Sequence, residues 1–123
     1  MVVLNNFLNE IAKSVNNESF VTPSHLAVGT EVLDIDVTDT SLAGEIGSRL
    51  ELSGSRSNNT LELVALRLST DVVDTTDGDD LKGFGILSAD TGGTIFIEND
   101  IAGILQTTNF DFEITETINI IGG

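Results

Sequence analysis

The chain has 123 residues, of which 40% are apolar, so it suits one domain with a modest core. Twenty acidic residues face five basic ones, and the formal net charge of -15 disfavours binding to nucleic-acid phosphates or anionic membranes. Cysteine is absent, which excludes disulfides and thiolate chemistry, and neither a membrane-spanning apolar run nor a secretory-signal pattern is visible.

The acidic balance also predicts a high-salt environment. A chain with this charge repels itself at low ionic strength, which destabilises the compact state. Concentrated salt screens the repulsion, because the Debye length falls to about 3 Å at 1 M. Few lysines, many acidic residues and mostly short apolar side chains fit a halophilic source; the alternative is an acidic mesophilic protein.

Residues 3–16 have the spacing of an amphipathic α-helix. One face carries the apolar side chains of Leu4, Phe7, Leu8, Ile11, Ala12 and Val15. Asn16-Asn17 suits the end of this helix, because asparagine tolerates the left-handed conformation of a C-cap. The apolar face predicts either packing on a sheet or an arm that docks on a neighbouring subunit.

From residue 20 onward the pattern is that of β-strands. Residues 26–28 predict a short strand, and residues 31–47 predict a polar loop or edge strand, with a candidate hinge at 29–40. "SRLELSGSRS" (48–57) and "TLELVALRLST" (60–70) predict an antiparallel pair joined by a turn. The apolar face switches near Val64, which predicts a β-bulge or a strand buried on both faces.

The C-terminal part predicts three further strands. "GFGIL" (83–87) and "TIFIE" (94–98) are joined by the turn formers "SADTGG". The last segment alternates, with apolar residues at Phe110, Phe112, Ile114, Ile118 and Ile120. Glu116 interrupts this apolar face, so we expect it where the strand leaves the core or opposite a cation at a subunit contact.

These elements predict a mainly β fold: an antiparallel β-sandwich or small, jelly-roll-like barrel with one N-terminal amphipathic helix. We expect residues 1–17 to form the helix, either as an arm or packed on the sheet. Residues 18–123 are expected to form a single β domain.

Residue patterns typical of catalytic or ligand-binding sites are scarce in the sequence. His25 is the one histidine, placed at a strand start, and we interpret it as structural. "GFG" and "TGG" form no phosphate-binding motif. The acidic run "DVVDTTDGDD" (71–80) predicts a solvated inter-strand loop; the alternative is a loose hard-cation site at Asp77, Asp79 and Asp80. We therefore expect no enzymatic activity and no cofactor.

Several segments resemble a known family when taken in order. "LAVGT" (26–30), "DTSLAGE" (39–45), "GILSADTGGTIF" (85–96) and "FDFEITETINI" (110–120) together resemble a diffuse family of tailed-virus virion proteins of the tail-fibre, head-fibre or decoration type. The chain departs from that pattern where "EVLDID" follows "VGT" and where Glu116-Thr117 replaces an aromatic residue. The resemblance implies a structural role without catalytic residues.

The expected function is therefore a surface-exposed, oligomeric capsid decoration or vertex protein located in the virion. A tail, baseplate or fibre component is the alternative, and a cellular calcium- or carbohydrate-binding β-module is the second. We expect threefold or fivefold homo-oligomers that contact other virion proteins and neither nucleic acid nor membrane. The candidate subunit contacts are Leu4, Phe7, Leu8, Ile11, Leu66, Leu68 and Glu116.

Overall fold

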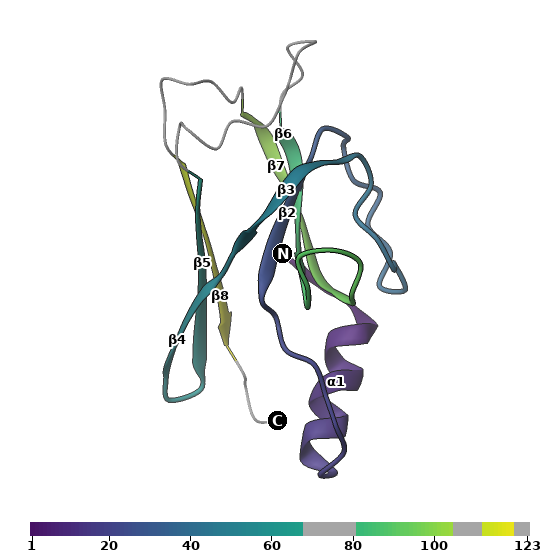
Figure 1. Cartoon of the computed structure of the whole chain (residues 1–123), viewed down its shortest axis with the longest axis vertical. Coiled ribbons are helices and arrows are strands. Elements are labelled where there is room, and N and C mark those ends of the chain that lie inside the picture. The colour runs from purple at the N-terminus through teal and green to yellow at the C-terminus, as the bar shows by residue number, and fades with distance from the viewer. Residues whose placement is uncertain (68–80, 105–111, 120–123) are drawn as a thin grey trace.

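The computed structural model describes residues 1–67, 81–104 and 112–119. In this part of the chain, two antiparallel sheets face each other and one helix follows the first strand (Figure 1). The predicted mainly β, sandwich-like fold with an N-terminal helix is confirmed. The barrel alternative is wrong, because the two sheets do not close into one.

The larger sheet has five strands and the smaller has three. Along the five-stranded sheet the order is β1 (Val2–Val3), β7 (Ile95–Ile104), β6 (Leu81–Leu87), β2 (His25–Gly29) and β3 (Glu45–Glu51). Along the three-stranded sheet it is β4 (Ser53–Ser57), β5 (Thr60–Arg67) and β8 (Phe112–Asn119). The sequence did not indicate β1, which adds the start of the chain to the edge of the larger sheet.

The segment 48–57 belongs to both sheets. β3 pairs with β2 in the larger sheet, and after the single residue Leu52 the chain continues as β4 of the smaller sheet. The predicted antiparallel pair is confirmed for β4 and β5, and Asn58 turns the hairpin with a φ of 52°. The predicted bulge near Val64 is wrong, since β5 pairs with both neighbours without a register shift.

β5 is also not buried on both faces. Leu63 and Ala65 point into the core, whereas Leu66 on the other face is half exposed. The apolar switch in the sequence therefore places one large apolar side chain on the outer surface of the smaller sheet.

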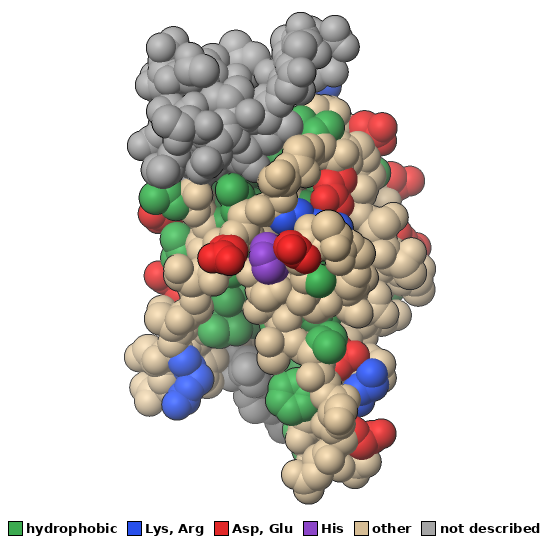
Figure 2. Space-filling view, viewed as in Figure 1, with side chains coloured by type: hydrophobic (Ala, Val, Ile, Leu, Met, Phe, Trp, Pro, Cys, Tyr) green, Lys and Arg blue, Asp and Glu red, His purple; other side chains and the backbone are tan. Residues whose placement is uncertain are grey.

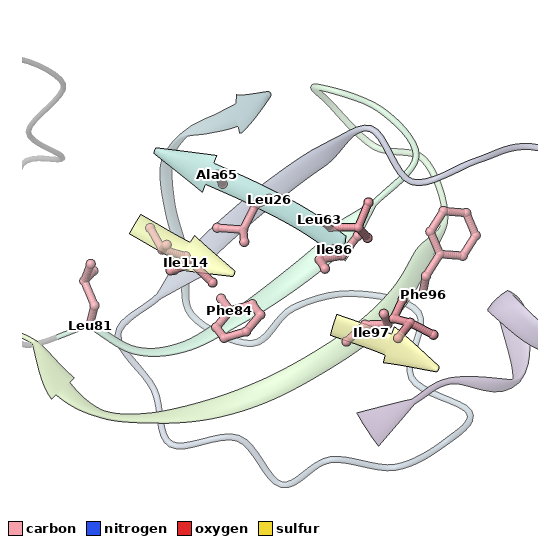
Figure 3. Close-up of a cluster of buried hydrophobic side chains, with 11 residues drawn as sticks. Leu26, Leu63, Ala65, Leu81, Phe84, Ile86, Phe96, Ile97 and Ile114 are labelled. Atoms are coloured by element: carbon pink, nitrogen blue, oxygen red, sulfur yellow. The ribbon is translucent and has the colours of Figure 1, made fainter. Parts of the chain in front are cut away.

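The main core lies between the two sheets. Buried side chains from both layers point toward one another in Figure 3. The larger sheet contributes Leu26, Val28, Leu81, Phe84, Ile86, Phe96 and Ile97, and the smaller sheet contributes Leu63, Ala65, Ile114 and Ile118. Facing apolar sheets of this kind are the usual way in which a sandwich excludes water.

The opposite face of the larger sheet is covered by residues 31–43, which we call the cover segment. It contains no strand, so of the range 31–47 predicted as a loop or edge strand, this part is a loop, whereas residues 45–47 begin β3 at the edge of the larger sheet. Its Leu33 and Leu42 are buried with Leu4, Ala27, Leu87 and Ile95 in a second apolar cluster. A Cβ atom on Gly83 would lie 2.8 Å from Leu33 Cγ, and one on Gly85 would lie 3.5 Å from Leu42 Cδ1. Gly83 thus makes room for Leu33 of the cover segment, whereas Gly85 mainly makes room for Ile95 of β7, whose Cδ1 would lie 3.0 Å from the added Cβ atom.

Helix α1 (Asn5–Val15) begins on the sheet and extends beyond it (Figure 1). The Asn5 amide donates to Val37 O at 2.8 Å, so the cover segment satisfies one free N–H of the first turn. At the other end, Asn17 has a φ of 57°, and the Glu18 and Asn17 amides donate to Lys13 O and Ser14 O. This Schellman arrangement confirms the helix end that Asn16-Asn17 predicted.

Candidate functional site

The cover segment encloses a carboxyl group, that of Glu98 on β7. Its cross-strand neighbours are Val2 on β1 and Gly85 on β6, and only 2% of its surface is exposed. Within the described residues, the Glu98 Oε2 atom is buried without a hydrogen-bond partner. The carboxyl of Asp39, from the cover segment, lies within hydrogen-bonding reach of the Glu98 side chain.

Asp39 is held in place by a tight turn of the cover segment. Its amide donates to Asp36 O at 2.9 Å, and its Oδ2 accepts from the Asp36 amide at 2.9 Å. Asp36 Oδ1 accepts from the Thr38 amide and hydroxyl, and these bonds lower the pKa of Asp36. Side-chain-to-backbone bonds of this kind are characteristic of Asx turns. The bonds of this turn therefore hold the Asp39 carboxylate in its position beside Glu98.

The electrostatics of the pair follow from this geometry. Burial raises the pKa of Glu98 to about 8, with further contributions from its hydrogen bond with Asp39 and from the negative charges of Asp39 and Asp100. At neutral pH the Glu98 carboxyl therefore keeps its proton.

A cavity of about 300 Å³ adjoins this pair. It is lined by Val32, Leu33, Asp34, Asp39, Ser41, Ala43 and Glu98. Carboxylate and hydroxyl oxygens are ligands that hard cations prefer. Among the described residues, however, no three His, Cys, Asp or Glu side chains lie close enough together to hold a metal ion.

A second, more open groove lies beside β2 and β3 and has a volume of about 640 Å³. Arg49 crosses it, pairs with Glu45 at 2.9 Å, and donates to the carbonyl oxygens of Ala89 and Gly92 in the β6–β7 loop. The groove is lined by His25, Glu45, Gly47, Ser48, Arg49, Glu51, Asp90, Thr91 and Gly92. Figure 2 shows the histidine at the surface with an acidic side chain on each side. Because the Arg49 guanidinium is already bonded to the protein, its main role in this groove is to hold the β6–β7 loop in place.

His25 fits the structural interpretation. It stands at the first position of β2, and its Nδ1 lies 2.8 Å from the Ser24 hydroxyl oxygen. A nucleophile, a base and an orienting group must lie in a chain of hydrogen bonds for triad chemistry. The bond between neighbouring residues Ser24 and His25 is a local contact of the chain and supports no catalytic role.

The third candidate surface is apolar. Leu8, Ile11 and Val15 share one side of α1 and are 56%, 38% and 79% exposed. The chain then runs back alongside the helix, where the Val21 amide donates to Glu10 Oε2 at 2.9 Å. This returning segment presents two further exposed apolar side chains, Phe20 and Val21. We call Leu8, Ile11 and Val15 the apolar helix surface; hydrophobic side chains are visible at the surface around this lower part of the molecule in Figure 2.

The predicted contact residues differ in how much of each side chain is exposed. Leu4 is fully buried in the second apolar cluster, so a folded copy does not present it to a neighbour, contrary to the expectation. Phe7 is partly buried against Phe96, with ring centroids 5.4 Å apart. Leu8, Ile11 and Leu66 are exposed as a contact requires. Leu68 and the acidic residues Asp77, Asp79 and Asp80 lie outside the described residues.

Glu116 takes neither of the positions expected for it. It lies on the inner face of β8 opposite Leu63, with only 9% of its surface exposed, so the strand has not left the core there. Burial raises its pKa, and the positive charge of the chain's amino terminus partly offsets this effect. Since Glu116 is buried in the sheet-to-sheet interior, it is not available for a cation of a neighbouring subunit.

Sequence reasoning missed Glu98 and its contact with Asp39. Glu98 ends "TIFIE", where a polar residue at a strand end is ordinary. The usable signal was indirect: Gly83 and Gly85 leave the face beside Glu98 flat, which calls for a covering segment. No spacing in the sequence indicates that residue 39 supplies the partner, because the contact depends on how the cover segment folds back.

The surface charge leads to a prediction about salt. In the described residues two ion pairs occur, Lys13–Glu10 and Arg49–Glu45, so most acidic groups remain uncompensated. Unfolding temperature is expected to rise steeply from 0.1 to 2 M potassium chloride, by about 4 °C for each ~1 kcal/mol of repulsion relieved. Thermal unfolding followed by circular dichroism measures this.

A charge-reduced variant provides the control for the salt prediction. Glu51, Glu62 and Glu113 are exposed, and replacing all three with glutamine removes three negative charges. Its unfolding temperature should rise less with salt than that of the wild type. A flat response of the wild type, or equal slopes for both proteins, would count against charge repulsion as the cause.

Comparison with known proteins adds no identification: no protein family, curated protein or solved structure matches the chain. No helix in the described ranges is long and apolar enough to cross a membrane.

Proposed function

We propose that this chain is a structural subunit of a tailed virion, exposed on the particle surface as an oligomeric capsid decoration or vertex protein. The observation that carries the proposal is the apolar helix surface. Single exposed apolar residues are normal on soluble proteins, but a cluster of them on one helix face is typical of a contact surface. Four segments, in their order along the chain, resemble tailed-virus virion proteins, and this resemblance supports a virion as the assembly.

The contact is most simply made with another copy of the same chain. Residues 1–17 contain one acidic residue, Glu10, and one basic residue, Lys13, which pair at 2.8 Å. The remainder of the chain therefore carries the net charge of -15. Two copies can approach through this locally neutral surface with less repulsion than through the acidic parts of the chain. Closed rings of three or five copies match the symmetry axes of a capsid.

Location in the particle tests the proposed function. Antibodies raised against the chain are applied to purified virions of the host's tailed viruses and located by immunogold electron microscopy. The proposal predicts labelling spread over the capsid or concentrated at its vertices. Labelling confined to the tail would support the tail-component alternative, and absence of the chain from mass spectra of purified particles would refute a virion role.

A further inference from the structure

The contact between Asp39 and Glu98 joins the cover segment to the larger sheet, to which it is also held by the burial of Leu33 and Leu42 and by a few hydrogen bonds. Across this boundary, the Leu33 amide donates to Asp100 Oδ1 at 2.9 Å, and the Asn5 amide donates to Val37 O at 2.8 Å. An ionised carboxylate only accepts hydrogen bonds, so two ionised groups in contact repel each other. A protonated carboxyl can donate, and it then forms a short, charge-assisted bond to its carboxylate neighbour.

We propose that Glu98 and Asp39 form a proton-held latch, in which the protonated Glu98 carboxyl donates to the Asp39 carboxylate and keeps the cover segment closed on the larger sheet. Loss of the proton leaves two adjacent negative charges in a buried site. The buried Leu33 and Leu42 still hold the segment on the sheet, so loss of the proton shifts the balance toward brief openings that expose the second apolar cluster.

The groups around Glu98 favour a proton as the bridge. The cover segment contributes the carboxylates of Asp34 and Asp39, and β7 itself contributes Asp100. β6 presents Gly83 and Gly85, and β1 presents Val2. The amino group of Met1 donates to Asn99 Oδ1, and the side-chain amide of Asn6 on α1 donates to the backbone oxygen of Asp39. No described basic side chain forms an ion pair with this cluster.

The sign of the pH dependence follows from proton linkage. The pKa of Glu98 is about 8 in the closed state, and in an open, solvated state it returns toward its ordinary value of 4.5. Between these values the closed state binds the extra proton, so raising the pH favours opening by about tenfold per pH unit. The latch is complete below pH 4.5, is lost as pH rises to about 8, and changes little above pH 8.

Nuclear magnetic resonance on the full chain at constant molar potassium chloride tests the latch. The side-chain carboxyl carbon of Glu98 should titrate near pH 8. Hydrogen-exchange protection of the Leu33 and Asn5 amides, corrected for intrinsic exchange, should fall by about tenfold per pH unit from pH 5 to 8. In Glu98→Gln the side-chain amide still donates to Asp39 but cannot titrate, so this protection should not vary over the same range.

Glu116→Gln is the matched control. Glu116 is also buried with a raised pKa, but it lies on the inner face of β8 in the smaller sheet, so the larger sheet separates it from the cover segment. This variant should retain the wild-type slope of Leu33 and Asn5 protection. Equal loss of slope in both variants would show that these amides exchange through global unfolding, and the latch would be refuted.

Two other results would overturn the proposal. Titration of the Glu98 carboxyl near its ordinary pKa in the wild type would show that the buried pair holds no proton at neutral pH. Recovery of Leu33 protection at pH 8 on adding calcium chloride at constant ionic strength, in the wild type but not in Glu98→Gln, would show that a cation holds the pair. The latch predicts that calcium has no such effect.

Discussion

Replacing Leu8 and Ile11 together with aspartate is expected to weaken association between copies by about 30-fold or more. Burying a Leu or Ile side chain completely contributes roughly 2 kcal/mol, and about half of each of these side chains is still exposed in the single chain. The two residues together therefore offer ~2 kcal/mol to a contact, which is about 30-fold in Kd, and the introduced charges add repulsion. Sedimentation velocity over a dilution series in 2 M potassium chloride measures the Kd.

The opposite side of the same helix supplies the control. Asn5→Asp/Asn9→Asp adds the same two charges at exposed polar positions of α1. Association should stay close to that of the wild type, and circular dichroism should show both variants folded. If the two variants weakened association equally, charge alone would be responsible, and the apolar helix surface would not be the contact.

Replacing Phe96 with alanine is expected to destabilise the fold by about 3–5 kcal/mol, the range for a buried Phe→Ala change. Phe96 is 0% exposed in the main core and stacks against Phe7 of α1 in a tilted arrangement. Its loss leaves a cavity where the sheet and the helix meet, so the helix should lose its docking site as well. A domain of this size typically has ~5–15 kcal/mol of stability, so the loss is a large fraction. Urea unfolding at constant molar potassium chloride measures it.

Phe20→Ala provides the comparison, because it removes the same atoms from a side chain that is 51% exposed. Measured at a concentration where the chain is monomeric, its stability should change by less than about 1 kcal/mol. Similar losses for Phe96→Ala and Phe20→Ala would mean that Phe96 does not have the buried position described above.

The sequence was informative wherever a local rule decides the structure. Helical spacing identified α1 but started it at residue 3, whereas Val2–Val3 form β1 and the helix begins at Asn5; the tolerance of asparagine for positive φ indicated its end at Asn17. The turn at "SADTGG" was equally clear, since Gly92 and Gly93 adopt φ values of 60° and 77° between β6 and β7. Alternation on β8 placed Ile114 and Ile118 correctly on the inner face.

Long-range partners were not accessible in the same way. The exchange of sheets at Leu52 interrupts no local pattern, so segment 48–57 was predicted as one strand. Burial of Glu98 requires the cover segment, which precedes it by more than fifty residues and has no regular structure. The burial of Leu4 likewise depends on β1 joining β7, and two residues are too few to show a periodicity.

The central claim is that copies of this chain assemble through the apolar helix surface. The most direct test is the molar mass of the wild-type chain by light scattering in 2 M potassium chloride, over a range of concentrations. We predict a discrete multiple of the 13.0 kDa chain mass, three or five copies, that falls toward the monomer in Leu8→Asp/Ile11→Asp. A wild-type mass of 13.0 kDa at every concentration would contradict the claim.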